Sequence, residues 1–149
     1  MAELTFAMGD YQARFPTDRQ YTRHHLWASS RGSIVQFGFT AYAERMLRDV
    51  YFLDWSVPEQ TPVQPQQSIG SIESKKANSE LYAPLAGNLI RFNMELMNDP
   101  SVINRDVYGK GWLYEIETEE ADELLPASAY LEHLKEVWKV TQRLLKGQS

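Results

Sequence analysis

The spacing of the apolar residues changes along the chain, and this change constrains the fold more than any other feature of the sequence. Over residues 21–117, bulky and β-branched residues gather in short runs separated by Gly, Pro, Asn and Asp, a pattern typical of β-strands. After Pro126, apolar residues recur at helical spacing. We therefore predict a mainly β domain over residues 21–117 and a helical extension over residues 118–149. Residues 1–20 show no clear period and are interpreted as an N-terminal arm.

Individual elements can be assigned within this plan. Thr40 is expected to cap a short helix over residues 40–47, because its hydroxyl can accept a hydrogen bond from a free N–H group of the first turn. A longer helix with one apolar face is expected over residues 128–146. That face is predicted to pack on the sheets, and the alternative is that its Trp138 end docks a partner. Strands are expected at 21–29, 33–39, 50–55, 68–74, 81–83, 87–93 and 111–117.

Composition excludes several classes of function. The 149 residues allow one domain of ordinary size, with a net charge of −5 that argues against a nucleic-acid partner, which needs a basic face. There is no cysteine, which excludes disulfides, thiolate nucleophiles and Cys-based metal sites. No apolar run is long enough for a membrane span, and the N-terminal residues lack a signal-peptide pattern. We therefore expect a cytoplasmic protein.

The familiar catalytic and metal-binding signatures are absent. The chain has no G-x-S-x-G, no G-x-x-x-x-G-K-[ST] and no G-x-G-x-x-G. His24 and His25 are adjacent, so on a strand they would face opposite sides and could not chelate one ion together. His133 is the only other histidine. We therefore predict neither catalytic residues nor a metal site.

One segment stands apart from the rest of the chain. Residues 73–87 read E-S-K-K-A-N-S-E-L-Y-A-P-L-A-G, with two lysines in a polar turn between two short strands. Such a turn can hold a lysine amine where a modifying enzyme reaches it, while the strands fix its position. The simpler interpretation is an ordinary hairpin whose exposed lysines are only hydrated.

This segment resembles the lipoyl-attachment region of the glycine cleavage H proteins, which reads E-S-V-K-A followed by a polar stretch and Y-A-P-V-S-G. In that match Lys76 takes the place of the lipoylated lysine and Lys75 takes the place of the valine. The neighbours that carry the match are Glu73, Ser74, Lys75, Ala77 and Glu80.

Three further segments resemble the same family in the same order along the chain. Residues 21–27 match Y-T-x-E-H-E-W, residues 37–43 match I-G-I-T-x-x-A, and residues 104–113 match N-x-D-P-Y-G-x-G-W. The resemblance implies a lipoyl- or biotinyl-type flattened β-sandwich, also called a hybrid barrel, with short helices at its edges. It also implies that lipoate is joined by an amide to Lys76, where a lipoate ligase or lipoyl transferase attaches it.

A protein of this kind is a carrier and not an enzyme, because the chemistry belongs to the cofactor and the chain supplies position. The implied swinging arm shuttles a covalently bound intermediate between partner enzymes, and tethering raises its effective concentration at each of them. His24, His25 and Leu26 are the candidates for a cleft that receives the arm.

The sequence departs from the family at two informative positions. Leu26 replaces the Glu of H-E-W, which in H proteins helps hold the ammonium of the cargo, whereas Glu80 matches an Asp that faces that cargo. Arg48 replaces a Gly, so the turn there is expected to differ.

The missing glutamate favours a relative of the H proteins whose cargo carries no ammonium. Lipoate-binding proteins of heterodisulfide-reductase-like sulfur oxidation fit this description, and their partner would be the heterodisulfide-reductase-like complex. The alternative is a genuine glycine cleavage H protein that carries aminomethyl-dihydrolipoyl between the glycine cleavage enzymes. A biotinyl carrier is disfavoured because Lys76 lacks flanking Met residues, and an unmodified H-like binding module is a further alternative.

Overall fold

A computed structural model describes residues 2–147, and within them strands are more extensive than helices. As predicted, the fold is mainly β. The strands are β1 (Glu3–Met8), β2 (Tyr11–Pro16), β3 (Gln20–Tyr21), β4 (Leu26–Arg31), β5 (Ile34–Phe39), β6 (Val50–Trp55), β7 (Thr61–Val63), β8 (Ser68–Ser74), β9 (Asn78–Tyr82), β10 (Gly87–Phe92), β11 (Tyr114–Glu117) and β12 (Leu125–Pro126).

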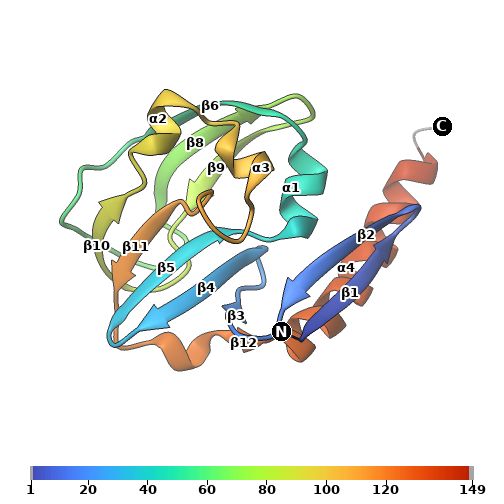
Figure 1. Ribbon diagram of the computed structural model, residues 1–149, viewed down its shortest axis with the longest axis horizontal. Helices are drawn as coiled ribbons and strands as arrows, with labels where there is room; N and C mark the ends of the chain where they lie inside the picture. Colours follow the sequence, from blue (N-terminus) through green and yellow to red (C-terminus); the bar gives the residue numbers. More distant parts are fainter. Residues whose placement is uncertain (1, 148–149) are drawn as a thin grey trace.

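Two sheets form the body of the molecule (Figure 1). A seven-stranded sheet has the order β12-β3-β4-β5-β11-β10-β7, and a three-stranded sheet has the order β6-β8-β9. Their ladders remain separate, so the expected sandwich is present but the sheets do not close into a barrel. The main core lies between them, where Val35 and Phe37 of the larger sheet belong to one buried cluster with Ile69 and Ile72 of the smaller one.

The short helix α1 (Ala41–Leu47) confirms the prediction made from Thr40. The Thr40 hydroxyl accepts a hydrogen bond from the Ala43 N–H at 3.3 Å, which satisfies one of the free donors of the first turn. Two one-turn helices, α2 (Glu95–Asn98) and α3 (Val102–Arg105), occupy a segment for which no helix or strand was assigned from the sequence. A 3₁₀ turn, η1 (Ala121–Glu123), precedes β12.

The first residues are not a loose arm but a hairpin, β1–β2, packed against the last helix. Helix α4 (Ala127–Gly147) is the predicted long helix, and Figure 1 shows it lying along the hairpin at one side of the sandwich. Tyr130 and Leu134 of α4 are buried with Phe15 and Tyr21 in a second core. The apolar face therefore covers the hairpin and β3. The side chains of the expected face residues Leu144 and Leu145 lie outside the described residues.

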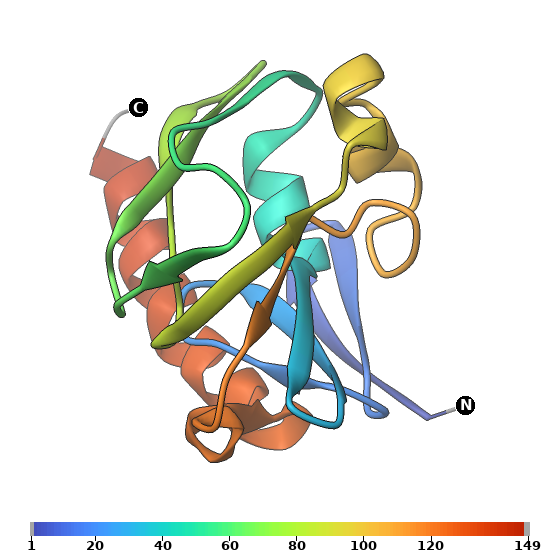
Figure 2. The same ribbon diagram turned by 90° about the vertical axis from the view of Figure 1, so that its left-hand side faces the viewer.

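The expected strand over residues 21–29 is interrupted. The Thr22 hydroxyl accepts a hydrogen bond from the Leu26 N–H at 3.2 Å, and His25 adopts a positive φ of 71°. This tight turn separates β3 from β4, so His24 and His25 lie in a turn and not on a strand, contrary to the prediction. Helix α4 contacts β12 and β3 of the larger sheet, and Figure 2 shows the same arrangement turned by 90°. None of the described helices is long and apolar enough to cross a membrane.

Candidate functional site

The turn between β8 and β9 presents two exposed lysines, Lys75 and Lys76. Ser74, the last residue of β8, closes this turn with both its backbone and its side chain. Its N–H and its hydroxyl donate to the Ala77 carbonyl at 2.9 and 2.8 Å, and its hydroxyl accepts from the Ala77 N–H at 3.2 Å. The turn is shorter than predicted, because residues 78–80 already belong to β9.

The lysine turn is also fastened to the rest of the protein. The Lys75 N–H donates to the Asp49 carbonyl at 2.9 Å, and the Lys76 N–H donates to the Leu47 carbonyl at 3.2 Å. Residues 47–49, here called the α1–β6 corner, join the end of α1 to the start of β6. The backbone of both lysines is thus fixed while their side chains point into solvent, which is the combination that a modifying enzyme needs.

Arg48 lies at the centre of this corner in an unusual backbone conformation. Its φ is 64° and its ψ is −149°, a region that is sterically open mainly to glycine. The sequence comparison with H proteins placed a glycine at this position and suggested a different turn here. In this structure Arg48 adopts a conformation that glycine takes without strain, so the arginine at this position has a cost in backbone strain.

A cleft of about 260 Å³ begins beside the lysine turn, because Leu47 of the corner and Ser79 of β9 both line it. From there it runs along β9 toward Gln66 and Pro84. Its walls come from both sheets and are largely apolar, with contributions from Leu26, Phe39, Leu47, Ile72, Leu81 and Leu113. The cleft can therefore hold an apolar chain out of water.

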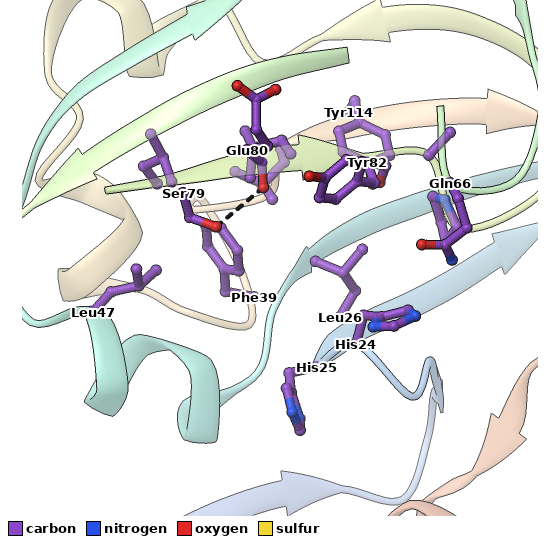
Figure 3. A pocket seen from close by; sticks show the side chains of 15 residues that line it. His24, His25, Leu26, Phe39, Leu47, Gln66, Ser79, Glu80, Tyr82 and Tyr114 are labelled. Carbon is purple, nitrogen blue, oxygen red and sulfur yellow. Dashed lines mark hydrogen bonds between the residues drawn. The ribbon is translucent and has the colours of Figure 1, made fainter. Parts of the chain in front are cut away.

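The three predicted cleft residues do not play the same part. All three border the cleft, as predicted, and Figure 3 shows the Leu26 side chain pointing toward β9. The His25 ring points away from Leu26 in the same view. It packs against Tyr42 with ring centroids 4.6 Å apart, and its Nδ1 shares a hydrogen bond of 2.9 Å with the Tyr130 hydroxyl.

Burial determines the charge state of His25. Loss of solvent, with smaller contributions from the nearby His133 and His24, lowers the pKa of this histidine to about 4. At neutral pH the ring is therefore uncharged. The Tyr130 hydroxyl continues the network to Thr40 at 2.9 Å. The sequence had given no sign of this link, because it joins residues 90 positions apart.

Among the described residues, Glu80 is the only acidic one that borders the cleft, and its carboxylate points away from Leu26 (Figure 3). It accepts a hydrogen bond from the hydroxyl of Ser68 on the neighbouring strand. The resemblance had suggested an acid facing the cargo at this position. The described residues place no carboxylate inside the cleft, and they contain no group of three His, Cys, Asp or Glu side chains able to hold a metal ion.

Comparison with known proteins agrees with the resemblance found in the motifs. The family model described as glycine cleavage H-protein matches residues 19–137. The H protein of the glycine cleavage system from Myxococcus xanthus is 42% identical over 118 residues, which cover 77% of this chain and 91% of that protein. The H protein from Thermus thermophilus is 37% identical over 124 residues, or 80% of this chain and 95% of that protein.

A solved structure shows the same fold. The crystal structure of a glycine cleavage system H protein from Mycobacterium marinum superimposes with a TM-score of 0.72 and 34% sequence identity. The match covers 81% of this chain and 99% of that one. The family match leaves out residues 1–18, which include the β1–β2 hairpin, and the end of α4.

Proposed function

The chain belongs to the glycine cleavage H-protein family, and from that premise we propose that it carries lipoate on Lys76. H proteins are non-catalytic carriers that hold lipoate covalently on a lysine. Bound lipoate supplies a dithiolane that can take up and release cargo by disulfide chemistry. The partners that we propose are a lipoate ligase or lipoyl transferase and the enzymes between which the carrier moves.

The residues of the site fit this cofactor. The fixed backbone of the lysine turn holds the attachment point, the exposed side chain admits the modifying enzyme, and the apolar cleft beside it can receive the arm. Leu26, Phe39 and Leu113 would exclude water from a parked arm.

One observation supports Lys76 over Lys75 as the attachment residue. The Lys76 N–H donates to Leu47, which itself lines the cleft, whereas the Lys75 N–H donates to Asp49, which does not. The backbone of Lys76 is thus the one tied directly to a wall of the cleft. This placement agrees with the position of the lipoylated lysine in the family pattern.

The test is in vitro lipoylation with a lipoate ligase, ATP and lipoate, followed by intact and peptide mass spectrometry. We expect Lys76→Arg to abolish the lipoyl mass shift, and Lys75→Arg, the matched control, to retain it. Both variants should keep the melting temperature of the parent, because an exposed turn side chain contributes little packing. Lipoylation of Lys76→Arg together with loss in Lys75→Arg would reverse the assignment.

We further propose that the pathway is glycine cleavage, with the glycine cleavage enzymes as partners. The family model and the curated relatives all support this choice over sulfur oxidation. Under this proposal, the replacement of the family's glutamate by Leu26 leaves the carrier function intact.

The composition of the cleft supports sulfur relay as a second candidate, with a heterodisulfide-reductase-like complex as the partner. Leu26 points into the cleft and the Glu80 carboxylate points out of it. The described residues therefore offer no carboxylate inside the cleft that could pair with an ammonium group. A neutral or sulfur-bearing end of the arm needs no such partner, whereas an amine cargo would lose a charge-assisted contact worth roughly 1.5–3 kcal/mol.

A reconstituted glycine cleavage assay separates the two candidates. The lipoylated protein is compared with the H protein of Thermus thermophilus, and Leu26→Glu is compared with Leu26→Gln, which has the same size but no charge. Glycine cleavage predicts turnover comparable to that of the Thermus thermophilus protein. Sulfur relay predicts poor turnover, which Leu26→Glu improves and Leu26→Gln does not.

A further inference from the structure

The α1–β6 corner that holds the lysine turn is itself held by one side chain, that of Asn104 in α3. The Asn104 amide nitrogen donates to the Arg48 carbonyl at 2.7 Å and to the Glu44 carboxylate at 2.8 Å. Its amide oxygen accepts from the Val50 N–H at 2.9 Å. One residue thus connects the middle of α1, the centre of the corner and the first residue of β6.

Only an asparagine-type amide can make this set of contacts. The amide nitrogen donates two hydrogen bonds and the amide oxygen accepts one. A carboxylate has no N–H to donate, and an aliphatic side chain can neither donate nor accept. The contact to Arg48 matters most, because that residue is in a strained conformation that the surrounding structure must maintain.

The lysine turn depends on the same corner. The carbonyls of Leu47 and Asp49, one on each side of Arg48, accept the N–H groups of Lys76 and Lys75. If the corner relaxed about Arg48, both carbonyls would change direction and the lysine turn would lose its two attachments. Asn104 lies outside the cleft lining and does not contact either lysine through the bonds that it makes.

We propose that Asn104 is a positioning residue for lipoylation, acting on Lys76 through the α1–β6 corner. This inference rests on the proposed function, because it takes Lys76 as the residue that is modified. Its role is to keep the lysine backbone in the one arrangement that the modifying enzyme meets. A misplacement of about 1 Å at a reacting group can reduce a rate by as much as roughly a hundredfold.

The chain provides a matched control in Asn93. This asparagine also makes three hydrogen bonds, donating to the Lys110 and Trp112 carbonyls at 2.8 Å each and accepting from the Glu95 N–H at 3.2 Å. It ties the end of β10 to the loop before β11, and none of its bonds reaches the corner or the lysine turn. Removal of either amide should therefore cost similar stability.

The experiment measures kcat/KM for lipoylation by a lipoate ligase, well below the melting temperature of every variant. We expect Asn104→Ala to lower kcat/KM about tenfold and Asn93→Ala to change it less than twofold. Acetylation of Lys76 by acetic anhydride, which needs no docking, should proceed equally in all variants. Adding Arg48→Gly to Asn104→Ala should restore much of the rate, because glycine holds the corner conformation without help.

Asn104→Asp is the second variant in case the alanine protein does not fold. It keeps the acceptor for the Val50 N–H but loses both donors, so it should also lower kcat/KM. Lipoylation of the Asn104 variants at the parent rate, or an equal loss in Asn93→Ala, would overturn the positioning role. Failure of the parent itself to gain lipoate at Lys76 would instead overturn the proposed function.

Discussion

Replacement of Arg48 by glycine should stabilise the protein. A non-glycine residue at φ 64° and ψ −149° costs on the order of 1–3 kcal/mol, and glycine removes that cost. Against this, glycine increases the entropy of the unfolded chain by roughly 0.5–1 kcal/mol. The Arg48 side chain makes no ion pair among the described residues, so little else is lost. The difference between these ranges runs from about 0 to 2.5 kcal/mol, and we take a net gain of about 1–2 kcal/mol from its upper part as the expected value.

The assay is thermal and urea unfolding of the unmodified protein at neutral pH. For a chain of this size, a gain of 1–2 kcal/mol corresponds to a rise of roughly 3–6 °C in melting temperature. Arg45→Gly is the matched control, because Arg45 lies inside α1, where glycine costs about 1 kcal/mol. The same chemical change should thus have opposite signs at two positions three residues apart. A lower melting temperature for Arg48→Gly would refute the claim that strain is stored in the corner.

Two further predictions concern the second core. Burial lowers the pKa of His25 to about 4 from an ordinary value near 6.5. The contribution of neutral His25 to the free energy of unfolding is therefore fully present above pH 6.5 and is lost as the pH falls toward 4. In urea unfolding, the free energy of unfolding of the parent should be about 2 kcal/mol lower at pH 5 than at pH 7. His25→Asn should remove this difference and His24→Asn should keep it; an equal difference in the parent and both variants would contradict the role of His25. Trp138 is half-buried against Phe6 and Tyr42, so Trp138→Ala should cost about 1–2 kcal/mol, less than a fully buried aromatic, whereas Val140→Ala at an exposed position should cost under about 0.5 kcal/mol. An unchanged melting temperature with loss of partner binding would instead assign Trp138 to docking.

The elements that could be predicted are those with local signals. Thr40 caps α1 through a contact three residues away, and α4 repeats its apolar positions every three to four residues. Both elements can therefore be predicted from a short stretch of sequence. The β1–β2 hairpin had a local signal too. Leu4, Phe6 and Met8 alternate, and the two-residue Gly9-Asp10 turn follows them, with Gly9 at a φ of 65°. This hairpin was not predicted from the sequence, because the alternation of apolar and polar residues covers only one short strand before the Gly9-Asp10 turn and one after it.

The features that could not be predicted depend on contacts between distant parts of the chain. Asn104 was noted only as part of a matching segment, and its importance follows from the corner that it contacts 54 to 60 residues earlier. For His25, the packing has such an origin but the interruption of the strand does not. The turn is held locally by Thr22, whereas the half-buried His25 ring bonds Tyr130, 105 residues further along.

Glu80 shows why a residue type at the expected position does not establish its role. Side chains on a strand alternate between two faces, so a shift of one residue turns a carboxylate from the inside of a cleft to the outside. The pairing of β8 with β9 contains an irregularity between Ser68 and Gly70: the ladder pairs Ser68 with Tyr82 and Ser71 with Glu80, and the Ser68 hydroxyl reaches the Glu80 carboxylate across the irregularity. Nothing in the local sequence marks it. The acid retained from the family pattern therefore points away from Leu26, so under the proposed function it does not take the place of the glutamate that Leu26 replaces.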